Sequence, residues 1–208
     1  MKPLLKAAAI LVCLVLLGGI AVVGYILNNG LSARDQPTPL EEFVAGTVRR
    51  LVVARQARGL SNPIASSQAV LVEARAHYAD HCAVCHANDG SGNTEMGRGL
   101  FPRAPNMRLA ATQKLSDGEL FWIIENGIRF TGMPGWSTGT NHGTDDSWKL
   151  VHFIRHLPAL TAEEISEMEG MNPRSPEDIR QELEEKRFLE GGDVSPAAPQ
   201  HEHGGKHD

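Results

Sequence analysis

The stretch His81-Cys82-Ala83-Val84-Cys85-His86 decides how this chain is interpreted. It contains a C-x-x-C-H pattern, which is the attachment motif for a covalently bound haem. On one helical turn the two thiols point to the same side, where each can add to a haem vinyl group. The next residue, His86, can then bring its imidazole to the iron from the same face. We therefore predict one haem c, attached at Cys82 and Cys85 and ligated by His86.

Other uses of a cysteine pair need patterns that this sequence lacks. A thioredoxin-like redox pair would stand beside a β-α-β pattern, and a zinc site would need a second ligand pair at comparable spacing. A plain disulfide or an isolated metal-binding pair remains the alternative. The third cysteine, Cys13, lies in an apolar run far from the motif.

Helix signals surround the motif, and we find no period-2 strand pattern. Capping boxes at Thr38-Pro39-Leu40-Glu41 and Ser116-Asp117-Gly118-Glu119 predict helix starts. The apolar spacing predicts helices over 38–58, 68–83, 116–127 and 145–157, the last stopped by Pro158. The loops expected at 88–106 and 131–143 are long for a compact domain, which indicates that they surround another part of the molecule or a bound group. The sequence therefore predicts an all-α fold with long loops.

Residues 70–158 resemble the class I c-type cytochromes. The resemblance is carried by four stretches, which are 81–86, Ala104-Pro105-Asn106-Met107, 126–134 and the closing helix WKLVHFIRHLP. It implies the class I cytochrome c fold, in which an N-terminal and a C-terminal helix cross around the covalent haem. In this chain the crossing would place Ala74 and Tyr78 against Leu150 and Phe153.

The resemblance also implies the second iron ligand, which is Met133 in Thr131-Gly132-Met133-Pro134. Glycine lets the backbone approach the ring closely and proline stiffens the loop. Histidine paired with methionine raises the reduction potential and suits electron transfer. The rival ligands are Met96, Met107 and His142, of which Met107 is expected to be a core contact.

Further residues are expected near the haem. The resemblance assigns the Pro105 carbonyl to accept a hydrogen bond from the His86 ring, which would orient the imidazole. Four aromatic residues could shield the haem, and three arginines are candidates for its propionates, although each is by default a core or surface residue: Trp122, Trp136, Trp148, Phe130, Arg103, Arg108 and Arg129.

The segment 7–27 has 21 residues without a charge, and a helix of that length spans roughly 30 Å. Lys2 and Lys6 precede it, so the positive-inside rule places residues 1–6 in the cytoplasm and the rest across the membrane. We expect an uncleaved anchor in a bacterial cytoplasmic membrane, with the haem domain on the periplasmic side. A cleaved signal peptide is the alternative.

Residues 28–69 are expected to form a tether and a juxtamembrane helix. The apolar stripe of this helix comprises Phe43, Val44, Val48, Leu51 and Val52. We expect the stripe to pack on this protein. Contact with lipid headgroups is the alternative, because four arginines accompany the stripe: Arg49, Arg50, Arg55 and Arg58.

After Pro158 the chain becomes acidic. Residues 159–190 predict a helical extension that is polar nearly all round, with capping boxes at Thr161 and Ser175. Residues 191–208 lack apolar side chains to bury and are expected to be disordered. The histidines of this tail, His201, His203 and His207, could bind a divalent metal weakly, although a solvated tail is the simpler expectation.

The formal net charge of -5 and the lack of a basic stripe argue against a nucleic-acid-binding protein. Residues 70–158 hold 8 basic and 9 acidic side chains, so docking should depend on an apolar patch rather than on charge. The sequence thus predicts a membrane-tethered, respiratory electron carrier that is not an enzyme and has no small-molecule substrate. The alternatives are a fixed electron-entry subunit of a membrane oxidoreductase, or a haem-based gas sensor in which Met133 dissociates.

Overall fold

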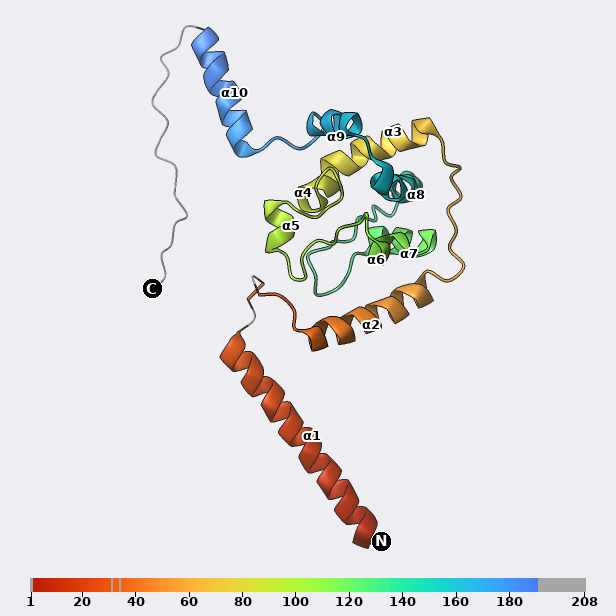
Figure 1. Cartoon of the computed structure of the whole chain (residues 1–208), viewed down its shortest axis with the longest axis vertical. Helices are drawn as coiled ribbons and strands as arrows, with labels where there is room; N and C mark the ends of the chain where they lie inside the picture. The colour runs from red at the N-terminus through yellow and green to blue at the C-terminus, as the bar shows by residue number, and fades with distance from the viewer. Residues whose placement is uncertain (1, 31, 34, 191–208) are drawn as a thin grey trace.

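The protein is described here by a computed structural model that covers residues 2–30, 32, 33 and 35–190. These residues form helices and loops, with no strand among them, as the sequence predicts. A long N-terminal helix projects from a rounded helical domain, and a further helix stands apart near the other end of the chain (Figure 1). The expected disorder and the expected metal site of residues 191–208 fall outside the described residues.

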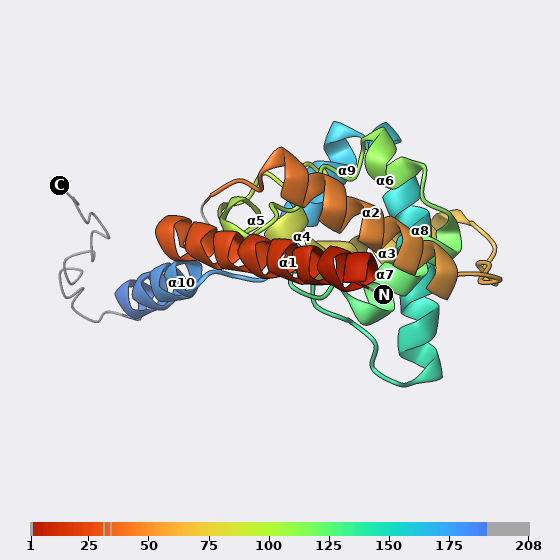
Figure 2. The same cartoon turned by 90° about the horizontal axis from the view of Figure 1, so that it is seen from below.

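The projecting helix is α1, Lys2–Asn29. Residues 2–28 are long and apolar enough to cross a bilayer, and none of this span is buried in the protein. A signal sequence near an N-terminus has the same features. The next helix, α2 (Pro39–Gln56), begins at the predicted capping box, where Thr38 and Glu41 cap each other. It runs along the edge of the domain from which α1 leaves (Figures 1 and 2).

The core lies between α3 (Gln68–His77) and α8 (Asn141–His156). The ring of Tyr78 packs on that of Phe153, with centroids 4.9 Å apart. Ala74 and Leu150 are buried in the same cluster, so the predicted contact between the two helices is confirmed. Helix α8 begins four residues earlier than predicted, because the Thr140 hydroxyl accepts a hydrogen bond from the Gly143 amide and caps the helix there.

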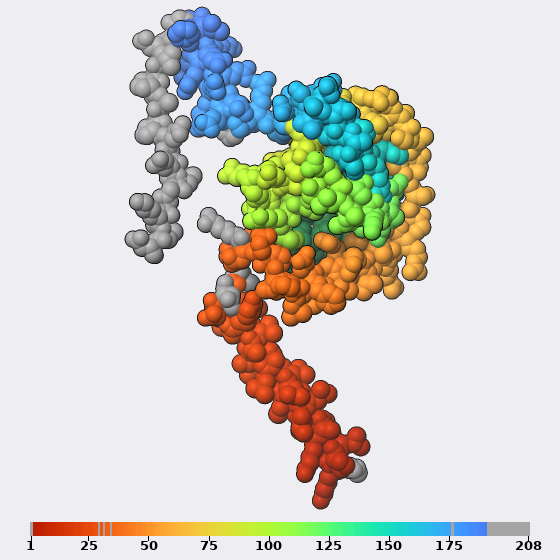
Figure 3. All heavy atoms as spheres, viewed as in Figure 1, coloured from red at the N-terminus to blue at the C-terminus, as the bar shows by residue number. Residues whose placement is uncertain are grey.

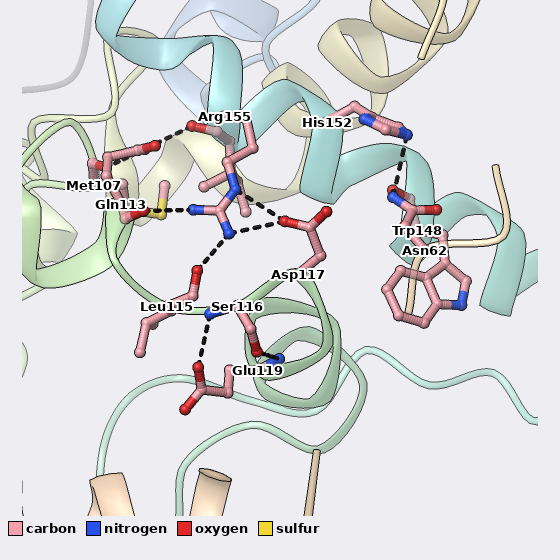
Figure 4. Close-up of polar contacts among 11 residues, drawn as sticks. Asn62, Met107, Gln113, Leu115, Ser116, Asp117, Glu119, Trp148, His152 and Arg155 are labelled. Atoms are coloured by element: carbon pink, nitrogen blue, oxygen red, sulfur yellow. Dashed lines mark hydrogen bonds and ion pairs between the residues drawn. The ribbon is translucent and has the colours of Figure 1, made fainter. Parts of the chain in front are cut away.

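Helix α7 (Asp117–Asn126) starts at the predicted capping box and packs against α8. The Phe121 ring stacks on Trp148 with centroids 3.9 Å apart and planes 7° apart. The short α6 (Ala110–Gln113) precedes it. Arg155 of α8 joins these elements, since its guanidinium donates to Asp117 Oδ1 and to the carbonyls of Gln113 and Leu115 (Figure 4).

Helix α9 (Ala162–Glu169) corrects one prediction, because it is not polar all round. Met168 is fully buried in the core cluster. The buried Arg75 of α3 forms ion pairs with Glu164, at 3.4 Å, and with Glu167, at 2.5 Å. Helix α9 is therefore fastened to the domain. Helix α10 (Pro176–Leu189) begins at the predicted Ser175 capping box and exposes its side chains.

Candidate functional site

The motif residues lie where the helix geometry changes. The sequence predicts one helix through residue 83, but after α3 the backbone forms a single π-helical turn, Tyr78–Cys82. The short helix α4, Ala83–His86, follows directly. The amide of Ala83 donates to the Tyr78 carbonyl, five residues back, which marks the wider turn. Such turns occur frequently at functional sites, and this one sets Cys82 at its end with Cys85 and His86 one turn on.

The chain leaves α4 through Ala87, which has φ 61° and ψ 157°. Three hydrogen bonds fix this residue. Its amide donates to the Ala83 carbonyl at 2.8 Å, and its carbonyl accepts from the Gly90 amide at 3.0 Å and from the Tyr78 hydroxyl at 3.1 Å. The position of His86 is therefore supported directly by the core residue Tyr78.

The loop after α4 folds back beneath it and leads into α5 (Glu95–Gly99). The Thr94 hydroxyl donates to the Val84 carbonyl at 2.8 Å, and the Gly92 amide donates to the His86 carbonyl at 2.8 Å. A Cβ on Gly97 would collide with the Cys85 carbonyl oxygen. Only glycine fits there, so the loop holds α4 by close backbone contact.

The imidazole of His86 is held in its neutral form. Burial lowers its pKa, while the Pro105 carbonyl acts in the opposite direction with a smaller effect. Nδ1 of His86 is buried and forms no hydrogen bond with the described residues. Neutral imidazole is the form that binds iron. The Pro105 carbonyl lies close enough to affect the pKa of the ring, but the predicted hydrogen bond between them is not formed, so its orienting role stays a prediction.

Cys82 and Cys85 are free thiols and form no disulfide with each other. Burial raises the pKa of Cys82 to about 12 and raises the pKa of Cys85 as well. Both side chains therefore stay protonated at neutral pH, unlike the low-pKa thiolate of a redox-active pair. Two free thiols and a neutral imidazole on consecutive turns are the groups that a covalent haem requires, so these residues fit it.

The loop that carries Met133 is closed by its own backbone. Gly127 ends α7 with φ 64°, and a Cβ there would lie 2.5 Å from the Met133 carbonyl oxygen. That oxygen accepts from the Ile128 amide at 3.1 Å, and the Met133 amide donates to the Thr131 hydroxyl at 3.2 Å. Met133 itself is half-buried. The loop is thus a defined turn rather than a loose connection.

Two contacts bring this loop to the motif. The Trp136 ring meets the His81 ring edge-on, with centroids 5.4 Å apart. A Cβ on Gly132 would collide with the side chain of Leu100, so the loop also lies against the segment after α5. The Met133 loop and the Cys82 turn are therefore neighbours. Spacing did not indicate the Trp136 contact or the Tyr78 hydrogen bond, and only the presence of an aromatic residue near each ligand hinted at them.

The rival ligands lie elsewhere. Met107 is buried in the core cluster, as expected. Met96 is exposed on α5. His142 belongs to the first turn of α8 rather than to a flexible loop, and its exposed ring faces Asp146 at 3.4 Å. None of the three belongs to the turn that Trp136 fastens to His81.

The other candidates near the haem are spread over the domain. Trp148 stacks on Phe121, Trp122 is half-buried, and Phe130 is 93% exposed with φ 62°. Arg108 pairs with Asp89 at 3.4 Å. Arg103 and Arg129 are exposed. Phe130 is therefore a surface residue here and does not pack inside the domain.

Comparison with known families agrees with this geometry. The family model described as cytochrome c oxidase, cbb3-type, subunit III matches residues 69–154. The comparison with curated proteins finds no match. The matched range begins at the start of α3 and ends inside α8, so it contains the motif, the Met133 loop and the two crossing helices. Together with the all-helical fold, the match identifies residues 69–154 as a c-type cytochrome domain of the class I fold.

Proposed function

We propose that the chain passes single electrons between redox proteins at the outer face of a bacterial cytoplasmic membrane, using one covalently bound haem c. The observation that carries the proposal is the Trp136 contact with His81, which brings the Met133 loop to the turn of Cys82, Cys85 and His86. The haem, when bound, supplies one-electron Fe(III)/Fe(II) chemistry.

The residues of the chain have separate roles in this proposal. Cys82 and Cys85 would hold the haem covalently, and His86 would provide a neutral imidazole ligand, with the nearby Pro105 carbonyl available to accept a hydrogen bond from its ring. Met133 provides the second ligand, whose thioether sulfur favours the ferrous state and raises the potential. The hydrogen bonds around Ala87 and within the Met133 turn keep both ligands in place. Little rearrangement should then accompany a change of oxidation state.

The same assignment makes the protein a carrier and not an enzyme. If His86 and Met133 both ligate the iron, the chain leaves no coordination position for a substrate. A gas sensor would need Met133 to dissociate. The closed turn that holds the Met133 backbone supports permanent ligation instead.

Membrane tethering by α1 is supported by its uncharged length and its lack of burial in the protein. Lys2 and Lys6 would keep the N-terminus in the cytoplasm and place the haem domain on the periplasmic side. N-terminal sequencing of the mature protein distinguishes an anchor from a signal peptide. A mature chain that starts beyond residue 29 would contradict the anchor.

A second candidate is a fixed electron-entry subunit of a membrane oxidase complex. It is favoured by the name of the matching family, which describes a subunit of such an oxidase. The exposed α10 would then be available for contact with other subunits. A free carrier and a fixed subunit use the same haem site and differ only in what remains bound to them.

One purification tests both candidates. The full chain is extracted from its native membrane in mild detergent, and the haem-to-protein ratio, the redox titration and carbon monoxide binding are measured. One low-spin haem per chain that excludes carbon monoxide supports the carrier. Oxidase subunits in fixed ratio would favour the second candidate, and rapid carbon monoxide binding at the reduced haem c of this chain, distinguished by its absorption spectrum from any oxidase haem, would contradict both.

A further inference from the structure

Helix α2 leaves its apolar stripe uncovered, contrary to the expectation that the stripe packs on this protein. Six apolar side chains are each 45–70% exposed: Leu40, Phe43, Val44, Val48, Leu51 and Val52. Only Val53, with Ala57 just beyond the helix, is buried on the other side, where α2 packs against α7. The helix therefore has one side fixed to the domain and a second apolar side facing outward.

The outward residues form one continuous face. Leu40, Val44, Val48 and Leu51 follow each other at spacings of three or four residues, which places them in a row along the helix. An 18-residue helix is about 27 Å long. Ordinary protein surfaces expose single, scattered apolar residues rather than a continuous row of this length.

Positive charge accompanies this face. Arg49, Arg50 and Arg55 on α2 are exposed, as is Arg58 just after it. None of these arginines forms an ion pair with any described residue. Arginine can extend its charged end toward water while its alkyl stem lies on an apolar surface. Apolar side chains with unpaired arginines are typical of helices that lie in the headgroup region of a membrane.

The domain holds α2 in this orientation. Beyond the helix, Asn62 donates to the Trp148 carbonyl of α8 at 3.0 Å and lies 3.1 Å from the His152 ring (Figure 4). A Cβ on Gly118 would lie 2.7 Å from the Leu60 carbonyl oxygen, so the backbones of α7 and this segment are in close contact. These contacts keep the outward face from turning inward to bury itself.

The sequence keeps α2 close to the end of α1. Nine residues, 30–38, separate the two helices, and nine extended residues cover at most about 30 Å. Helix α2 lies on the side of the domain from which α1 leaves and forms part of the surface there (Figures 1–3).

We propose that α2 lies flat in the membrane interface, with its outward apolar face among the acyl chains and its arginines at anionic lipid headgroups. This inference rests on the proposed anchoring by α1. Because α2 is fixed to α7 and α8, lipid contact would set the orientation of the whole haem domain relative to the membrane.

Collision measurements on a nitroxide label test the inference. The full haem-loaded chain carries Cys13→Ser, which leaves no free thiol once Cys82 and Cys85 are bonded to haem. One variant adds Leu51→Cys on the outward face, and the control adds Glu42→Cys, which is exposed and lies nine residues, half a helical rotation, away from position 51. Both are reconstituted into phosphatidylcholine vesicles with and without phosphatidylglycerol.

In vesicles that contain phosphatidylglycerol, the ratio of oxygen to nickel-chelate accessibility should be several-fold higher at position 51 than at position 42. The ratio at position 51 should fall when phosphatidylglycerol is omitted. Equal, water-like ratios at both positions would overturn the proposal. So would spin–spin broadening at position 51, which would mean that a second copy covers the face. An unchanged ratio without phosphatidylglycerol would overturn the role of the anionic headgroups.

A separate measurement isolates the anchor. Flotation of the same vesicles after a carbonate wash reports on α1, and protein lost at that step contradicts anchoring rather than lipid contact by α2.

In a further variant, Phe43→Ser and Val48→Ser accompany the label at position 51. Because both side chains are exposed, the haem spectrum should not change, whereas the accessibility ratio should drop to that of position 42. A ratio that stays high would overturn the proposal.

Discussion

The His81 ring meets the Trp136 ring edge-on, with centroids 5.4 Å apart and planes at 87°. His81 directly precedes Cys82, the first cysteine of the proposed haem attachment, and Trp136 follows Met133 by three residues. This contact therefore ties together the two chain segments that supply the proposed iron ligands. Trp136 is a positioning residue in this arrangement, because it acts on the ligand loop and is not itself a proposed ligand.

Trp136→Ala should loosen the Met133 loop. We expect a loss of about 1–3 kcal/mol in the free energy of unfolding, since a half-buried ring is removed. The reduced protein should also bind carbon monoxide faster than the parent. Denaturant titration and carbon monoxide kinetics measure the two effects. Trp136→Phe is the control and should restore most of both, whereas unchanged kinetics in Trp136→Ala would contradict the positioning role.

Met133→Ala should remove one iron ligand. The sulfur-to-iron charge-transfer absorption of the oxidised protein should disappear, and the reduced protein should bind carbon monoxide. Met133→His should keep a low-spin haem at a substantially lower potential, because imidazole favours the ferrous state less than thioether sulfur does. Redox titration of the three proteins provides the comparison. Retention of the absorption band in Met133→Ala would assign the ligand to Met107 or Met96, whereas a low-spin haem without the band would point to His142.

Cys82→Ser and Cys85→Ser should each leave one thioether bond, and the double variant should leave none. Haem-stained denaturing gels and the mass of the intact chain distinguish these states. The double variant should lose its haem to acid acetone, while the parent keeps it. The matched control is Cys13→Ser in α1, which should not alter attachment. Haem colour that survives denaturation in the double variant would show attachment elsewhere.

Acidification should weaken the attachment of α9. Burial raises the pKa of Glu164, but the Thr161 amide, His156 and Arg75 together hold it below the ordinary value of 4.5. A lowered pKa in the folded state means that the ionised form stabilises the fold. This contribution is complete above pH 4.5 and is lost as the pH falls through the lowered pKa.

Hydrogen exchange of residues 162–169 across this pH range measures the effect. Protection should decline on acidification in the parent, and Glu164→Gln should reduce protection at neutral pH and flatten its pH dependence. Glu163→Gln, on an exposed neighbour, is the control and should behave like the parent. Identical pH profiles for the parent and Glu164→Gln would contradict the prediction.

Local signals explain which parts of the fold the sequence could predict. The capping boxes at Thr38, Ser116, Thr161 and Ser175 involve neighbouring residues only, and all four cap helices in the structure. The C-x-x-C-H motif is equally local. The contact of Tyr78 with Phe153 joins distant segments, but the resemblance to a known fold supplied it.

What could not be predicted depends on partners distant in the sequence. Met168 is buried on a helix whose acidic residues Glu164 and Glu167 pair with Arg75, and nothing near residue 168 reveals that partner. The contact of Trp136 with His81 likewise forms only after the chain has closed around the site. The stripe of α2 was misassigned for a related reason, since amphipathic spacing is the same whether protein or lipid covers the face.

Ala87 gives the site a conformational cost. Its combination of φ 61° and ψ 157° falls in a region that is adopted almost only by glycine, and holding another residue there costs of order 1–3 kcal/mol. The hydrogen bonds from Tyr78 and Gly90 offset that cost, one residue from the iron ligand. Ala87→Gly should therefore make the folded chain more tolerant of losing the Tyr78 hydroxyl. In the native chain, the strained backbone of Ala87 therefore links the packing of the core to the orientation of the His86 imidazole.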